Sequence, residues 1–179
     1  MKDGRILELF FNEPTKQWHF EEILKRAEIS RPQAAQWLSK FIKDKLIRRI
    51  KIKSKMPYYI SDYNSVNYQN KKRLFMLNQF YSSGFLNHLQ SSKAKTVIIF
   101  GSMNRWDWYK DSDIDLFVYG DDNGLEIGKY ELKLKRDIQL FSAKNKEDLK
   151  KLSPDLIQNI FNGFIVKGSI KQAGVKIRA

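Results

Sequence analysis

Two short apolar runs constrain the fold of this 179-residue chain more than any other feature. The first is TVIIF at 96–100, and the second lies within DIDLFVYG at 113–120. A short apolar run that is bounded by turn residues is typical of a buried strand, although periodicity alone does not separate it from a buried helix. We therefore expect a small sheet in the second half of the chain.

The remaining segments of this half carry further helix and strand signals. They predict, in order, a short helix, a third strand, two helices and a last edge strand at 125–134, 136–141, 145–152, 154–162 and 163–168. Helices and strands in this mixture predict an α+β domain, which we assign to residues 93–179.

The N-terminal part has a different pattern. Helical spacing of apolar residues occurs at 5–11 and 20–27, and a third helix is expected after Ser30, which could cap it in a capping box with Gln33. The period then changes to that of a strand in LIRRIKIK, and SKMP followed by YYI completes a basic hairpin. Three helices and a basic hairpin predict a winged helix-turn-helix over residues 1–61.

Residues 62–92 predict a helical connector between these two domains. The apolar residues that we expect to pack it against its surroundings are Val66, Leu74, Leu77, Phe85 and Leu89. We find no internal repeat and no low-complexity segment.

Composition excludes several classes of protein and site. The chain has no cysteine, which excludes disulfides and thiolate metal sites, and its two histidines make a histidine-built zinc centre a poor hypothesis. No apolar run approaches the roughly 20 residues of a membrane helix, and MKDGRILELF lacks the apolar core of a signal peptide. We therefore expect a cytoplasmic protein with no membrane partner.

The net charge of +13 is unevenly distributed. Residues 1–60 contain 14 Lys and Arg against 7 Asp and Glu, whereas residues 96–179 contain 14 against 12. A polyanion such as DNA or RNA would favour the N-terminal part. The alternative is a Lys-rich surface that serves solubility alone.

Within the predicted winged helix, the third helix would face base edges and the hairpin would contact phosphates. A winged helix used only for protein contact or dimerisation is the alternative. The residues predicted to contact nucleic acid are Arg31, Gln33, Gln36, Lys40, Arg48, Arg49, Lys51 and Lys53.

The residues with the clearest potential for catalysis are Gly101–Ser102 and the pair Asp113 and Asp115. Because side chains alternate along a strand, the two carboxylates point to one side and repel each other, so a cation should compensate them. Mg²⁺ or Mn²⁺ fits, since hard cations bind carboxylates together with phosphate oxygens. Glycine allows positive φ and close backbone approach, and N–H groups with the Ser102 hydroxyl can hold phosphate oxygens.

Two more residues extend the predicted site. Asp137 would lie beside Asp113 and Asp115 if its strand neighbours theirs, and it could bind the metal or help to deprotonate an attacking hydroxyl. Arg105 could neutralise charge on a leaving pyrophosphate. A plain surface role stays open for both, and the rival third carboxylates are Asp111, Asp121, Asp122 and Glu131.

The loop after Arg105 is rich in aromatic residues. Trp106, Trp108 and Tyr109 could stack on a nucleotide base. We expect instead that they pack the loop onto the sheet, because large aromatic side chains are more often buried than used as a platform for a base.

The joint motif resembles the active-site signature of the DNA polymerase beta superfamily of nucleotidyltransferases. The likeness is greatest to the minimal nucleotidyltransferase group, whose pattern reads GSxxR followed by SDIDL. It covers about residues 96–141, and RWDWY departs from it where the family more commonly has Arg-Gly. The matching residues are Gly101, Ser102, Arg105, Ser112, Asp113, Asp115 and Leu116.

This resemblance implies a short mixed sheet with flanking helices and a metal site at Asp113, Asp115 and a third carboxylate, for which we choose Asp137. The implied activity is transfer of a nucleoside monophosphate, with AMP favoured, from an NTP such as ATP onto a protein or nucleic-acid hydroxyl. Relatives in the group act as antitoxins that modify a helical HEPN toxin. A DNA-binding, antitoxin-type regulator is therefore the alternative, and a catalytically idle scaffold is a third hypothesis.

Overall fold

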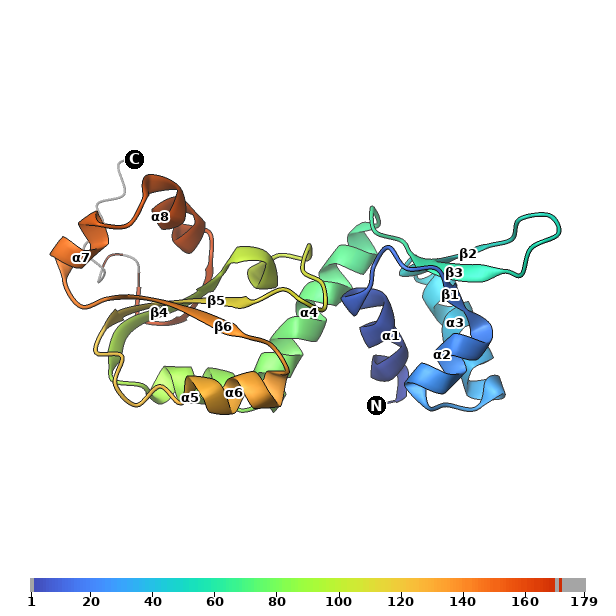
Figure 1. Ribbon diagram of the computed structural model, residues 1–179, viewed down its shortest axis with the longest axis horizontal. Helices are drawn as coiled ribbons and strands as arrows, with labels where there is room; N and C mark the ends of the chain where they lie inside the picture. The colour runs from blue at the N-terminus through green and yellow to red at the C-terminus, as the bar shows by residue number, and fades with distance from the viewer. Residues whose placement is uncertain (1, 170, 172–179) are drawn as a thin grey trace. The chain divides into compact units, whose positions relative to one another are not determined.

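The computed structural model describes residues 2–169 and residue 171 (Figure 1). The chain forms two compact units. The N-terminal unit comprises Met1–Leu74 with Trp108–Lys110, and the C-terminal unit comprises Phe75–Asp107 with Asp111–Ala179. Three residues from a loop in the second half of the sequence therefore belong to the first unit.

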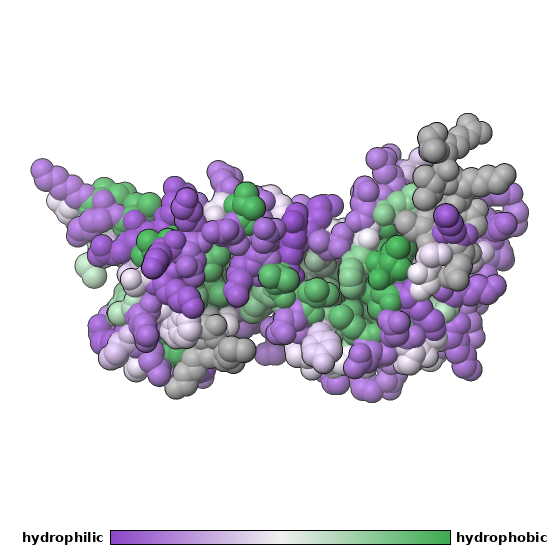
Figure 2. Space-filling view, turned by 180° about the vertical axis from the view of Figure 1, so that it is seen from behind, coloured by the Kyte–Doolittle hydropathy of each residue, from purple (hydrophilic) through white to green (hydrophobic). Residues whose placement is uncertain are grey.

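Hydrophilic side chains predominate on the face drawn in Figure 2. Within the part of the chain that the structure describes, none of the helices combines the length and the apolar character that a membrane crossing requires.

The N-terminal unit contains the three predicted helices: α1 (Lys2–Asn12), α2 (Phe20–Ala27) and α3 (Arg31–Lys43). Ser30 precedes α3 in an extended conformation, but its side chain makes no hydrogen bond to the helix end, so the predicted capping box is wrong. The start of α3 is favoured instead by Pro32 in the first turn, where a proline loses no helical hydrogen bond.

A three-stranded antiparallel sheet accompanies these helices. Its strands β1 (Trp18–His19), β2 (Ile47–Ile50) and β3 (Tyr58–Ser61) lie in the order β1-β3-β2. The sequence did not predict β1, and it predicted a longer β2. The β2–β3 ladder ends at the pair Ile50 and Tyr58, because the next residue on the β3 side is Pro57, which has no N–H to donate.

Two helices form the segment that was predicted as a connector: α4 (Val66–Ser82) and α5 (Phe85–Ser91). Gly84 separates them with a φ of 81°, a conformation that glycine adopts without strain. The boundary between the two compact units falls inside α4, after Leu74.

The buried face of α4 differs from the predicted one. Phe85 and Leu89 of α5 are buried as expected, but Val66, Leu74 and Leu77 are exposed. Apolar residues occupy both sides of α4, so periodicity alone did not identify the packed side. The residues of α4 that are buried recur every four positions and are Tyr68, Lys72, Met76 and Phe80.

A four-stranded mixed sheet forms the centre of the C-terminal unit. Its strands are β4 (Ala94–Phe100), β5 (Ile114–Gly120), β6 (Ile138–Ala143) and β7 (Phe164–Lys167), in the order β6-β5-β4-β7. Strand β5 is antiparallel to β4 and parallel to β6, and β7 is antiparallel to β4. The predicted edge strand at the end of the chain is therefore present.

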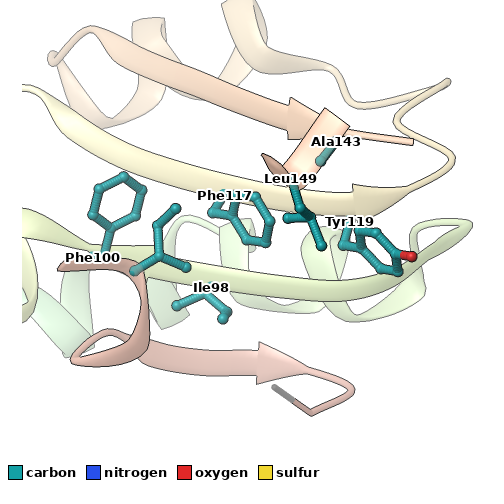
Figure 3. Packing of buried hydrophobic residues seen from close by; sticks show 7 residues of the cluster. Ile98, Phe100, Phe117, Tyr119, Ala143 and Leu149 are labelled. Atoms are coloured by element: carbon teal, nitrogen blue, oxygen red, sulfur yellow. The ribbon is translucent and has the colours of Figure 1, made fainter. Parts of the chain in front are cut away.

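Helices cover both faces of this sheet (Figure 1): α5 and α6 (Ile127–Leu134) lie on one face, and α7 (Lys146–Lys150) and α8 (Pro154–Phe161) on the other. The expected α+β architecture, a short mixed sheet with flanking helices, is confirmed. On the α7 and α8 side, Figure 3 shows the packed cluster, whose members are Ile98, Phe100, Phe117, Tyr119, Ala143, Leu149 and Ile160.

Candidate functional site

The predicted site residues meet where β4 ends and β5 begins. Phe100, the last residue of β4, pairs with Asp115 of β5, and Gly101 follows directly. Gly101 has a φ of 72°, which confirms the expected positive φ. A Cβ atom on Gly101 would lie 1.9 Å from Oδ2 of Asp115, so only glycine leaves room for this carboxylate.

The turn after β4 is a short 3₁₀ helix, η1 (Gly101–Asn104). The Arg105 N–H donates to the Ser102 carbonyl over 3.0 Å and closes it. The Asn104 side-chain amide donates to the Asn162 carbonyl, just after α8, over 2.8 Å. Asn104 thus holds the turn in place, a role that no sequence motif indicated.

The neighbouring strand brings Asp137 to the same end of the sheet. The Ile114 N–H donates to the Asp137 carbonyl over 2.8 Å, and Ile114 pairs with Ile138 in the parallel ladder. Asp113 comes directly before β5, and Asp137 comes directly before β6. Because residues paired across strands share a face, the side chains of Asp113 and Asp137 lie on the same face of the sheet. The expectation that the two strands are neighbours is therefore confirmed.

Two residues at this end of β6 were missed at the sequence level. Gln139 pairs with Asp115 and is exposed on the same face. The Arg136 guanidinium donates to the Ser112 carbonyl over 3.0 Å and so fixes the backbone just before Asp113. The only signal for either was proximity to Asp137 in RDIQLF.

The surroundings of Asp115 shift the pKa of its carboxyl group. Its side chain is half-buried, and this burial raises the pKa of the Asp115 carboxyl. Repulsion from Asp113 raises this pKa further, and the positive charge of Arg105 partly opposes the rise. A half-buried carboxylate beside a second carboxylate favours the binding of a cation.

Arg105 is already engaged in the structure. Its Nε donates to Oδ1 of Asp107 over 3.1 Å, and its Nη2 donates to Oδ2 over 2.9 Å. This forked pair raises the pKa of the Arg105 guanidinium, with a smaller contribution from Asp115. Asp107, which belongs to the RWDWY departure from the family pattern, is therefore a further residue of the site that sequence analysis missed.

The carboxylates fit a metal by their chemistry, but they do not converge. Asp113 and Asp137 are exposed, and among residues 2–169 and 171 no group of three or more Asp, Glu or His is close enough to hold an ion. The electrostatic pairing in the structure is between Asp113 and Asp115, with Asp137 one strand away. Oxygen ligands of this kind suit Mg²⁺ or Mn²⁺.

A comparison with protein families now bears on this arrangement. Residues 86–169 match the family described as polymerase beta, nucleotidyltransferase. This match supports the resemblance to the polymerase beta superfamily. The matched segment contains the whole mixed sheet and the candidate site. The match therefore supports a transferase domain here and suggests nucleotidyl transfer as its general reaction. Neither a curated protein nor a solved structure matches the chain.

The residues predicted to contact nucleic acid lie in the N-terminal unit. Arg31, Gln33, Gln36 and Lys40 are on α3, Arg48 and Arg49 are on β2, and Lys51 and Lys53 are in the loop that follows. All are exposed except Gln33, which is half-buried.

Several of these cations already have partners. Nη2 of Arg31 lies 2.8 Å from Oε1 of Glu21, and Nε of Arg48 lies 3.4 Å from Oδ1 of Asp62. The Lys51 ammonium donates to the Lys55 carbonyl over 3.2 Å. These pairings reduce the charge that Arg31 and Arg48 offer to a polyanion.

Proposed function

We propose that the C-terminal domain is a metal-dependent nucleotidyltransferase that moves a nucleoside monophosphate, with AMP favoured, from an NTP onto a protein or nucleic-acid hydroxyl. The observation that carries this proposal is the close approach of Gly101, which follows β4, to Asp115, near the start of β5. It joins the turn that would hold phosphate to a carboxylate that would hold metal, inside a segment that matches the nucleotidyltransferase family.

In this proposal, Ser102 and the N–H groups of its turn bind the β- and γ-phosphates. Asp113 and Asp115 would hold Mg²⁺ or Mn²⁺, which stabilises charge that develops on the phosphate oxygens. Arg105 keeps one nitrogen, Nη1, outside its forked pair with Asp107, and this nitrogen can approach the leaving pyrophosphate.

The reaction is a displacement at the α-phosphorus. The oxygen of the acceptor hydroxyl forms a bond to this phosphorus, and the bond from phosphorus to the bridging oxygen of the β-phosphate breaks. Pyrophosphate leaves, and the hydroxyl proton passes to the Asp137 carboxylate or to water. The chain contributes mainly by positioning the groups and by electrostatic stabilisation.

The test uses ATP labelled in the α-phosphate, Mg²⁺ and candidate protein and nucleic-acid acceptors. We expect Asp113→Asn and Asp115→Asn to lower labelling at least about 100-fold, as loss of a group that stabilises transition-state charge does. Asp155→Asn is the matched control, because this exposed carboxylate of α8 is not among the candidates for the metal site. Undiminished labelling by the Asp113 and Asp115 variants would contradict the proposal.

We propose as a second function that residues 1–61 form a winged helix-turn-helix that binds DNA, joined through 62–92 to the transferase domain at 93–179. The observation in its favour is the hairpin formed by β2, the loop that follows and β3, where Arg49, Lys51 and Lys53 are all exposed. Such a protein could serve as an antitoxin-type regulator, in which the accepting hydroxyl belongs to a HEPN toxin.

A further inference from the structure

The loop that joins the phosphate-side turn to the first carboxylate has an unusual middle. It runs from Arg105 to Ser112, and its central residues Trp108–Lys110 belong to the N-terminal unit. The Trp108 side chain is completely buried there. The prediction that this tryptophan is a packing residue is confirmed, but the prediction that it packs onto the mixed sheet is wrong, since Phe11 and Lys72, which contact it, belong to the N-terminal unit. Tyr109, which was predicted to pack in the same way, is exposed.

Contacts from α1 and α4 hold this segment. The ring of Phe11 meets the ring of Trp108 edge to face at 6.3 Å between centroids. The Lys110 N–H donates to the Asn12 carbonyl over 2.9 Å. Lys72 of α4 donates from its ammonium to the Trp108 carbonyl, and the same ammonium lies 4.4 Å from the centre of the Trp108 ring.

Lys72 is the least expected of these residues, because its side chain is completely buried. A buried ammonium loses its hydration and needs compensating contacts. The Trp108 carbonyl and ring provide two of them, and the Tyr68 ring, 5.7 Å away, provides a third. A cation–π contact that is shielded from water is stronger than an exposed one, so these contacts favour one placement of Trp108 over others.

We propose that Lys72 and Trp108 are positioning residues for the candidate nucleotide site. They fix the middle of the loop, and Arg105 lies three residues before Trp108 while Asp113 lies five residues after it. A chain segment reaches at most about 3.6 Å per residue, so an anchored centre restricts where both functional residues can lie. This inference rests on the proposed nucleotidyltransferase function.

Hydrogen–deuterium exchange of the full-length protein tests the anchor directly. We expect Lys72→Met to raise the rate of amide exchange at least about tenfold across residues 103–113, because the loop opens locally more easily. The amides of β4 and β5 should keep their protection. Lys71→Met is the matched control, since Lys71 is the exposed neighbour of Lys72 in α4. Unchanged exchange in the loop of Lys72→Met would overturn the proposal.

Two milder variants, Lys72→Arg and Trp108→Phe, cover the case that Lys72→Met does not fold. Lys72→Arg keeps a cation and a donor, so it should retain most of the protection. Trp108→Phe keeps a smaller ring, so its loop should exchange faster than that of the wild type. Equal protection in Trp108→Phe and the wild type would also count against the anchor.

Calorimetric binding of α,β-methylene-ATP with Mg²⁺ separates positioning from a purely structural role. The measurement is made at a temperature where the variant is still folded. We expect Lys72→Met to weaken nucleotide binding about tenfold, because misplacing groups that contact a ligand costs affinity. Faster loop exchange with unchanged affinity would refute the positioning role. Absence of binding in the wild type would instead refute the proposed function, and the positioning role with it.

Discussion

Gly101 shows how much can depend on one residue of the site. Its φ of 72° and the 1.9 Å between an added Cβ and Oδ2 of Asp115 are two separate demands. The positive φ would strain the backbone of any other residue. An added Cβ atom would displace the Asp115 carboxylate, which is proposed to hold metal. The sequence alone indicated the first demand, through the turn chemistry of a Gly-Ser pair at the end of a strand.

A pair of glycine substitutions separates these two demands. Gly124 also has a positive φ, 81°, but nothing lies within 4 Å of an added Cβ there. We expect Gly124→Ala to lower the free energy of unfolding by about 1 kcal/mol from backbone strain alone. Gly101→Ala should lower it by about 2–4 kcal/mol, because the clash adds to the strain.

Urea unfolding of both variants measures the difference, and nucleotide binding with Mg²⁺ shows whether Asp115 has moved. Equal losses of stability at the two positions would show that Asp115 adjusts to the added methyl group at little cost. In that case Gly101 would be required for its backbone conformation alone.

At the scale of elements, α4 is the informative case. Its sequence presents apolar residues on two sides, and the packed side is the one that contains Met76 and Phe80. The centre of the Phe80 ring lies 5.9 Å from that of Phe85, which connects α4 to α5. The exposed side, with Leu74 and Leu77, is the side that was predicted to pack.

Neighbouring aromatic residues in α4 provide a matched test of this packing. Phe80 is 3% exposed and Tyr81 is 66% exposed. We expect Phe80→Ala to lower the free energy of unfolding by about 3–5 kcal/mol, through reduced burial and a residual cavity. Tyr81→Ala should change it by less than about 0.5 kcal/mol, as exposed substitutions usually do.

Thermal and urea unfolding followed by circular dichroism would measure both variants. A loss of stability from Tyr81→Ala comparable to that from Phe80→Ala would mean that the outer side of α4 is covered in solution.

At the scale of the whole molecule, the uneven charge is the dominant feature. The excess of Lys and Arg over Asp and Glu lies in the first half, and the carboxylates of the site lie in the second. A polyanion should therefore bind the N-terminal unit, and the binding should weaken steeply with added salt because counterions are released from the nucleic acid.

Fluorescence anisotropy with a duplex of about 20 base pairs, between about 50 and 200 mM salt, tests this expectation. The double variant Arg49→Ala, Lys53→Ala should make the plot of log association constant against log salt less steep by about 1.8. This is about 0.9 for each phosphate that is no longer neutralised. The matched control is Lys146→Ala, Lys150→Ala, two exposed cations of α7 in the C-terminal unit. Equal slopes for the two variants would contradict binding through the hairpin.

The sequence by itself determined the kinds and order of most helices and strands, because hydrophobic period and turn residues act over a few positions. It also indicated the chemistry of Gly101, Ser102, Asp113 and Asp115, since their spacing and residue types are properties of one short segment. It did not indicate β1, whose two residues form a strand only because β3 lies beside them.

Only the tertiary structure decided which residues from distant segments meet. It paired Asp115 with Gln139 and buried Lys72 against Trp108. These contacts depend on strand register, on loop geometry and on which side of a helix is covered. Such choices are made by packing between segments, and a local pattern carries no information about them.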